Sequence, residues 1–349
     1  MRTKDQTVPH VLKRLAQLLG TQLINTRLEI PPQFGSGYCI GFVFNKHIRM
    51  LISNYELNED VIVQNPDVDT AKKMIFFKFQ NIFPKAERSS IFRHKTPSVL
   101  IGTSRINTDD VISIHTNTAT INIEVDANYL KGLFTSSQES SVLKGLLQNK
   151  RPLLFEQVMY PSLQKIVDEI LSGPANETFK LFFLRVKAEE LICRLLMELE
   201  NRDEKQLHAL NIHDIQAVYR VKQQILEHLE TPPVIKALAL DAHMSPTKLK
   251  RLFRQIFGDS IFSYYQEFRM QEAALLLSAE KLSVAAVGYR MGFTNLSHFS
   301  RVFKAHIGMN PKHYALRAPN KGAFQTSCIV LKNLNNSKRT KFFFWTVIS

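Results

Sequence analysis

The order of hydrophobic and polar positions divides the chain into a β-rich part and a helical part. Between residues 20 and 125, runs rich in β-branched and aromatic side chains are separated by clusters of turn-forming residues. The runs lie at 38–44, 72–83, 98–103 and 110–126. In the last run Ile121, Ile123 and Val125 alternate with polar residues, which is the period of a half-buried strand. Several short strands at this spacing predict a small barrel or sandwich.

From about residue 127 the hydrophobic period becomes that of helices. The stretch 160–173 has a proline near its start and ends in glycine, as helices commonly do, and 175–201 has the charged and apolar faces of a long helix. We predict that 127–200 is a helical segment for packing or dimerisation. The polar stretch 201–211 is the predicted linker, and helical patterns continue after it to about residue 317.

The helical part contains an internal repeat, in which the pattern of residues 245–258 returns at 295–308. Arg251 corresponds to Arg301, and both copies end in a glycine that suits a helix C-terminus. A serine or asparagine suited to capping precedes the second helix of each copy, so each copy reads as helix, short turn and helix. This helix-turn-helix pattern places its second helix in the major groove of DNA.

The stretch between the two copies, 261–278, contains neither glycine nor proline. It predicts one helix of about 17 residues, about 25 Å long. Such a helix would hold the two units along one face of a duplex, near the ~34 Å of one turn of DNA.

The net charge of +14 is concentrated in the helical part. Residues 231–317 contain 12 Lys and Arg against 5 Asp and Glu, and residues 318–349 contain 5 basic residues and no acidic one. Basic charge gathered at one end suggests a polyanionic partner for that end, although a solvated basic surface would have the same composition.

Other features of the sequence argue against enzymes, metal proteins and membrane proteins. The 349 residues are 44% hydrophobic and 22% charged, as in a soluble protein of two or three domains. No apolar run reaches the ~20 residues of a membrane helix, no signal peptide is visible, and the cysteines are widely spaced, which together predict a cytoplasmic protein. The loop 35–41 lacks a glycine that phosphate binding needs at Ile40, and the histidines form no metal motif. We expect no catalytic residue, metal or cofactor.

Residues 292–314 read GFTNLSHFSRVFKAHIGMNPKHY, which is close to the signature of the AraC/XylS family of bacterial transcription regulators, and the segment 214–317 as a whole resembles that family. The signature positions are Gly292, Phe293, Ser297, Phe299, Ser300, Arg301, Phe303, Lys304, Gly308, Pro311 and Tyr314. The first copy of the repeat resembles one branch of this family, which contains siderophore-responsive regulators of the pyochelin type. Gly288 departs from the family, which usually has alanine there, and should weaken its helix slightly.

The resemblance implies an α+β protein that acts as an effector-responsive transcription regulator. It assigns 1–126 to a sensing domain built on a cupin-like barrel, and 212–317 to an all-α domain whose two helix-turn-helix units read adjacent major grooves of double-stranded DNA. The basic tail 318–349 is not part of the family pattern, and we expect it to be disordered. RNA polymerase, a small-molecule effector and a second copy of the chain are the further partners that the resemblance implies. A role as an activator is one expectation, and the sequence leaves activation and repression both open.

Exposed polar positions on the second helix of each copy are the candidate DNA contacts. They are Thr247, Lys248, Lys250, Arg251 and Arg254 in the first copy, and Asn295, Ser297, His298, Ser300, Arg301 and Lys304 in the second. Arg251 and Arg301 are expected to read bases, because arginine binds guanine O6 and N7 with two hydrogen bonds. Arg254 and Lys304 are expected to contact the DNA backbone.

Two alternatives stay open at this point. For the remaining candidates, plain solvent exposure explains the sequence as well as DNA contact does. The whole chain is alternatively a ligand-binding or enzymatic β-barrel protein whose helices form a protein-interaction module. Binding to another protein does not require matched arginines on two helices, and this favours DNA binding.

Overall fold

The computed structural model describes residues 8–58, 73–82, 97–103, 117–134, 140–202, 207–278, 280 and 282–317. The contacts of the chain form two compact units, Met1–Gln266 and Glu267–Ser349. The predicted strand positions 110–116 and the predicted tail 318–349 lie outside the described residues. Among the helices that the structure describes, none is both long and apolar enough to cross a membrane.

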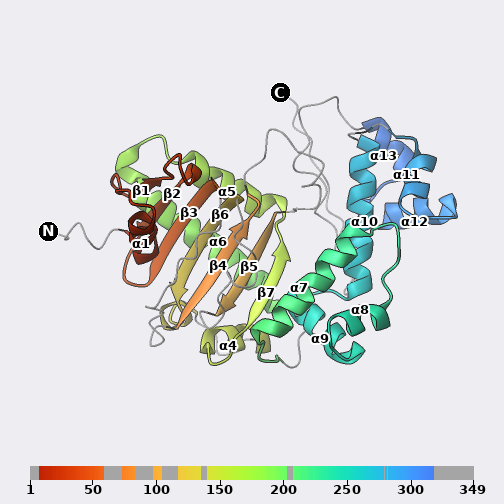
Figure 1. The fold of residues 1–349 in the computed structure, drawn as a ribbon, viewed down its shortest axis with the longest axis horizontal. Helices are drawn as coiled ribbons and strands as arrows, with labels where there is room; N and C mark the ends of the chain where they lie inside the picture. The colour runs from red at the N-terminus through yellow and green to blue at the C-terminus, as the bar shows by residue number, and fades with distance from the viewer. Residues whose placement is uncertain are drawn as a thin grey trace. The chain divides into compact units, whose positions relative to one another are not determined.

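A seven-stranded antiparallel sheet forms the centre of the first unit (Figure 1). Its strands are β1 (Arg27–Glu29), β2 (Gly35–Val43), β3 (Ile48–Leu57), β4 (Met74–Gln80), β5 (Ser98–Thr103), β6 (Asn117–Asp126) and β7 (Leu154–Val158). They lie in the order β1-β2-β3-β6-β4-β5-β7. Within the described residues, the end strands β1 and β7 pair with no further strand. The predicted β-rich domain is thus confirmed, while its closure into a cupin-like barrel stays a prediction.

The helices of this unit are mostly those that the sequence predicts. They are α1 (His10–Leu18), α3 (Ala127–Lys131), α4 (Ser141–Gln148), α5 (Pro161–Ser172), the short 3₁₀ helix η3 (Glu177–Phe179), α6 (Lys180–Glu200), α7 (Ile212–Glu227), α8 (Ile235–Asp241) and α9 (Pro246–Phe257). α5 begins with the predicted proline and ends at Gly173, whose φ is +69°. α6 covers most of the stretch 175–201 predicted from its charged and apolar faces, and η3 precedes it.

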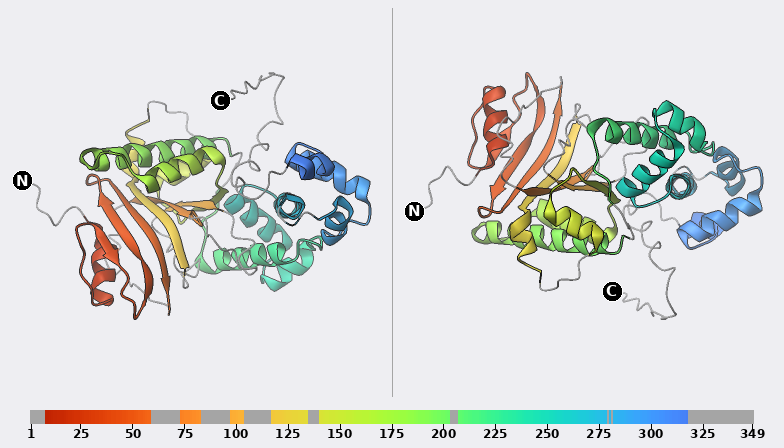
Figure 2. Two further views of the ribbon diagram at one scale, coloured as in Figure 1. Left: turned by 90° about the horizontal axis from the view of Figure 1, so that it is seen from above. Right: turned by 90° about the horizontal axis from the view of Figure 1, so that it is seen from below.

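The main core lies between the sheet and the helices α5 and α6, which cover one face of it (Figure 2). Ile121, Ile123 and Val125 of the central strand β6 are fully buried, as their alternation predicts. They belong to one hydrophobic cluster with Leu163 of α5 and Leu191 of α6. A smaller cluster joins α1 to β1, β2 and β3.

β7 interrupts the predicted helical segment 127–200. Its five residues, LFEQV, are too few to show a hydrophobic period, and the prolines Pro152 and Pro161 flank it on either side. Its second residue, Phe155, is fully buried, so tertiary packing decides the conformation. The sequence patterns do not mark β1 or β3 either.

The second unit is helical and begins within α10 (Ile261–Ser278), which fills the whole stretch predicted between the two copies of the repeat. It continues with α11 (Val284–Arg290), α12 (Leu296–Ile307) and α13 (Pro311–Arg317). Phe299 and Phe303 of α12 are fully buried in its core, together with Met270 and Leu277 of α10. Val302, also on α12, is only partly buried against this cluster.

Candidate nucleic-acid interface

The helix α9 is built as the repeat predicts. Ser245 caps its first turn, because the Ser245 hydroxyl accepts a hydrogen bond from the backbone N–H of Lys248 at 3.2 Å. Pro246 occupies its first turn, and Gly258 ends the helix with a φ of +79°. The Leu249 and Phe253 side chains are fully buried and fix which face of α9 points outward.

The outward face of α9 carries most of the predicted DNA contacts of the first copy. Thr247, Lys250, Arg251 and Arg254 are exposed. Arg251 forms no salt bridge with another described residue, whereas Arg254 already has an interaction within the chain. Lys248 lies 2.7 Å from the Asp214 carboxylate on α7, so a DNA phosphate would have to compete with Asp214 for its ammonium group.

The helix α12 repeats this arrangement in the second unit. Its cap is Asn295, whose side-chain oxygen accepts hydrogen bonds from the backbone N–H groups of Ser297 at 2.9 Å and His298 at 3.0 Å. Gly308 ends the helix with a φ of +86°. Because capping occupies the Asn295 oxygen, only its amide NH₂ group remains for a DNA contact.

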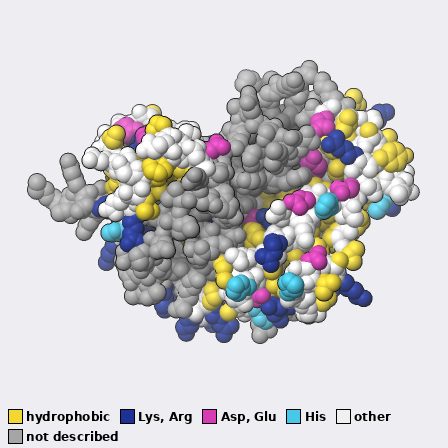
Figure 3. Space-filling view, viewed as in Figure 1, with side chains coloured by type: hydrophobic (Ala, Val, Ile, Leu, Met, Phe, Trp, Pro, Cys, Tyr) yellow, Lys and Arg dark blue, Asp and Glu magenta, His cyan; other side chains and the backbone are white. Residues whose placement is uncertain are grey.

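Four of the predicted contacts in α12 are exposed, namely Ser297, His298, Arg301 and Lys304, and Ser300 is half-buried. Neither Arg301 nor Lys304 forms a salt bridge with another described residue. On the part of the described surface that Figure 3 shows, basic, acidic and histidine side chains all occur. The assignment of DNA contacts rests on these particular helix positions.

A buried arginine that the sequence reasoning missed organises the turn before α12. Arg269 of α10 lies with its guanidinium 3.8 Å from the centre of the Phe293 ring and donates from Nε to the Met291 carbonyl at 2.8 Å. Phe293 follows Gly292, which has a φ of +72°. The signature positions Gly292 and Phe293 therefore shape the turn, and Arg269 holds it from the neighbouring helix.

A buried ion pair, which we call the Glu156 junction, joins β7 of the sheet to α7, the helix that packs against α9. The Glu156 carboxylate on β7 lies 2.6 Å from the Lys222 ammonium and accepts a 2.6 Å hydrogen bond from the Tyr219 hydroxyl, both on α7. The Tyr219 ring packs edge-on against Phe257 of α9, with ring centres 5.5 Å apart. Burial, and then the Glu156 charge, raise the pKa of Tyr219 well above 10.

The described residues on either side of 203–206, in the predicted linker, also bind α9. Arg202 donates to the Glu156 carbonyl on β7 at 2.8 Å and to the Ile256 carbonyl of α9 at 3.3 Å. The buried Gln255 side chain of α9 exchanges two hydrogen bonds with the His208 backbone, at 2.8 and 2.9 Å. The inner face of α9 is thus fixed to the sheet domain through polar contacts, while its outer face stays exposed.

The part of the chain that the structure describes includes side chains of the kinds that bind metals, and two free cysteines. No group of three or more His, Cys, Asp or Glu residues there is arranged to hold a metal ion. Cys39 is buried and its pKa is raised to about 12 by that burial, whereas Cys193 is exposed.

Comparisons with known proteins find relatives of the C-terminal part of the chain. Residues 238–317 match the helix-turn-helix domain family. The arabinose operon regulatory protein of Salmonella typhimurium is 38% identical over 93 residues, 26% of this chain and 33% of that protein. Regulatory protein PchR of Pseudomonas aeruginosa is 35% identical over 71 residues, 20% of this chain and 24% of PchR. A solved transcriptional regulator of Chromobacterium violaceum, with an AraC-type DNA-binding domain, is 25% identical, with a TM-score of 0.30, and the match covers 32% of this chain and 100% of that one.

The paired helices define a protein with a helix-turn-helix domain. That domain is of the AraC/XylS type, as the resemblance of residues 292–314 predicts. The chain spans only about a third of the length of the arabinose regulator and about a quarter of PchR. PchR is one of several matches, and the pyochelin-type branch stays a prediction.

Proposed function

We propose that the chain is a sequence-specific transcription regulator that reads two adjacent major grooves of double-stranded DNA with α9 and α12. The observation that carries this proposal is the matched build of the two helices. Each has a capped N-terminus, a buried apolar face, a C-terminal glycine and an exposed arginine at the corresponding position, Arg251 or Arg301, that forms no salt bridge with another described residue. Exposed cations at helix positions that enter the groove are what base and phosphate recognition require.

The two arginines and Lys304 have different roles in this proposal. Arg251 and Arg301 bind guanine edges, each worth about 1–3 kcal/mol of discrimination between bases. Lys304, one turn further along α12 than Arg301, binds a phosphate and contributes equally on every sequence. Thr247, Lys250, Ser297 and His298 are exposed on the same two helices and supply the remaining contacts.

Binding of the full chain to operators selected from a random DNA pool tests the proposal. Arg301→Ala should lower the affinity for the selected operator by about 1–3 kcal/mol and relax preference at one half of the site only. Lys304→Ala should weaken all sequences alike and make the salt dependence shallower by about one unit. Lys165→Ala, an exposed lysine on α5, is the matched control and should change neither property. A folded chain that selects no DNA at low salt would instead favour a protein-interaction module.

We also infer that the sheet domain senses an effector and that effector binding changes the position of the first helix-turn-helix unit, α8 and α9. The support is the Glu156 junction, in which β7, Arg202 and α7 hold the inner face of α9. A change in the sheet domain that moves β7 has a direct route to α9 through these contacts. The cupin-like barrel, the activating outcome, contact with RNA polymerase and action in the cytoplasm belong to the same proposal and rest on the family resemblance.

A second copy of the chain is the proposed partner of α6. Phe179, Phe182, Val186, Cys193 and Met197 are exposed at or along this helix, at successive spacings of three, four, seven and four residues. Such spacings place these apolar side chains on one face of the helix, outside the core, with Glu189 and Glu190 between Val186 and Cys193. Two copies related by a two-fold axis would cover the same face of each other, as the commonest class of homodimer does.

Sedimentation of the full chain tests this dimer. Phe182→Glu combined with Val186→Glu should leave a monomer at concentrations where the unaltered chain is a dimer, because two charges would be buried in the interface. Leu240→Glu, at a side chain on α8 that is 75% exposed, is the control and should leave the dimer intact. An unaltered chain that stays monomeric at high micromolar concentration contradicts the proposal.

A further inference from the structure

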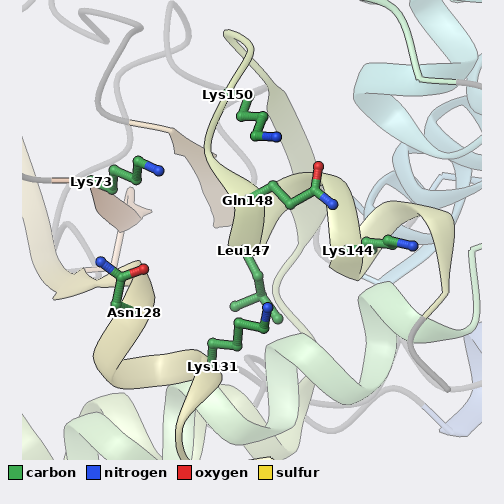
Figure 4. Close-up of a pocket in the computed structure, with 7 residues that line it drawn as sticks. All are labelled: Lys73, Asn128, Lys131, Lys144, Leu147, Gln148 and Lys150. Atoms are coloured by element: carbon green, nitrogen blue, oxygen red, sulfur yellow. The ribbon is translucent and has the colours of Figure 1, made fainter. Parts of the chain in front are cut away.

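Four lysines line a pocket in the first unit whose residues are separate from those of α9 and α12. The pocket has a volume of about 320 Å³ and its lysines are Lys73, Lys131, Lys144 and Lys150 (Figure 4). They come from three segments, namely the residue before β4, the end of α3, and α4 with the residues after it. Asn128, Gln148 and Leu147 complete the lining.

These three segments are tied together beneath the pocket. The Lys73 carbonyl accepts a 2.8 Å hydrogen bond from the backbone N–H of Ala127, where α3 begins. The buried Asn149 side chain donates to the Met74 carbonyl at 2.8 Å. Asn149 also ends α4 in the left-handed conformation, with a φ of +47°, and so sets the direction of the chain at Lys150. The lysine backbones are therefore held in place before any ligand arrives.

The positive charge of the pocket has no counterpart among the described residues. No described acidic side chain lines it, and none of the four lysines forms a salt bridge with a described residue. By contrast, Lys187, Lys222 and Lys248 of the same unit each pair with a carboxylate. The negative end of the α3 dipole explains why a lysine, Lys131, is favourable in the last turn of α3. It does not explain why four lysines from three segments lie around one pocket.

We propose that this pocket binds a small ligand with two or more negatively charged oxygens, from phosphate or carboxylate groups. The four ammonium groups would pair with the oxygens and lose their mutual repulsion, and a concave site with one sign of charge attracts such a ligand over a distance. The Asn128 and Gln148 amides supply neutral donors, and the buried Leu147 supplies an apolar contact. The volume is at the lower end of the range for ligand pockets, which fits a compact anion better than a DNA backbone. This inference does not depend on DNA binding.

Calorimetric titration of the full chain with pyrophosphate and, separately, with citrate tests the site, in low salt and without divalent metal. Binding of either anion supports the proposal, and the stronger of the two identifies the phosphate or carboxylate class. Lys131→Gln combined with Lys144→Gln should weaken binding by at least about tenfold, the loss expected for a charge-assisted hydrogen bond. Lys46→Gln combined with Lys165→Gln removes two exposed lysines outside the pocket and should change affinity by less than about twofold. Circular dichroism should show all chains equally folded.

Three results would overturn the proposal. One is that neither anion binds the unaltered chain more tightly than about 1 mM. Another is that the pocket and control pairs lose affinity equally, which would mean diffuse attraction to a basic protein. The third is that neither anion binds while the pocket pair lowers DNA affinity and makes the salt dependence shallower by about two units, which would make the pocket a DNA contact.

Discussion

Replacing Lys222 with methionine should destabilise the packing of α7 on β7 by about 3 kcal/mol. The Glu156 side chain is 5% exposed and the Lys222 side chain 19%, so this ion pair is largely shielded from water. Methionine keeps most of the lysine volume but removes the charge. Among the described residues, Tyr219 then remains as the side chain that donates to the buried Glu156 carboxylate. Breaking a buried ion pair at one partner costs about 3–5 kcal/mol, and the remaining hydroxyl places this case at the lower end.

A second substitution separates the buried charge from the loss of packing. Glu156→Gln together with Lys222→Met removes both charges, so the double variant should recover most of the loss and stay within about 1–2 kcal/mol of the unaltered chain. Lys165→Met, on the exposed surface of α5, is the control and should cost less than about 0.5 kcal/mol.

Native-state hydrogen exchange is the suitable assay, because a chain with two compact units does not guarantee a single unfolding transition. The free energy of opening is read from peptides that cover β7 and α7. If Lys222→Met lowers it no more than Lys165→Met does, or if the double variant is as destabilised as Lys222→Met alone, the junction is not held by the buried charge pair.

Three further predictions follow from buried groups. The folded chain keeps Tyr219 neutral, because its pKa is raised, while the unfolded chain ionises it near pH 10. This contribution to stability is therefore present below pH 10 and is lost as the pH rises above it. Tyr219→Phe should flatten the decline of the urea midpoint between pH 9 and 11, and an unchanged decline would contradict this. Iodoacetamide at pH 8 and low protein concentration should label Cys193 and not Cys39, whose pKa is about 12, as peptide mass spectrometry would show; equal labelling would mean that Cys39 is accessible. Gly288→Val should reduce stability by about 1–3 kcal/mol and so lower the thermal midpoint, because even a Cβ there would lie 2.6 Å from the Leu296 side chain. An unchanged midpoint would show that α11 and α12 have room to separate.

Local signals explain why the sequence predicts α9, α10 and α12 so closely. Ser245, Asn295, Gly258 and Gly308 cap or end their helices as expected, because capping depends on residues within a few positions of the helix end. The same holds for β6, whose alternating residues are buried on one face only. The candidate DNA contacts could be placed on helix faces for the same reason, although their roles stay predictions.

Features that depend on distant contacts could not be predicted. Glu156 is 63 and 66 positions away from its partners Tyr219 and Lys222, and it lies in a strand too short to show a pattern. Arg269 looks like an ordinary charged residue of a helix until its contact with the Met291 carbonyl is known. The lysines of the basic pocket are spread between positions 73 and 150 among many others. No local pattern in the sequence marks such groups, because only the folded chain brings them together.

Methylation interference on a selected operator measures base reading by the two helices most directly. Methyl groups at guanine N7 block arginine, so the unaltered chain should show two groups of sensitive guanines about 10 base pairs apart. Arg301→Ala should abolish the sensitivity of one group and Arg251→Ala that of the other, with the opposite group unchanged in each case. If both groups keep their sensitivity in both variants, the arginines do not read bases, and the proposed reading of two grooves by α9 and α12 is wrong.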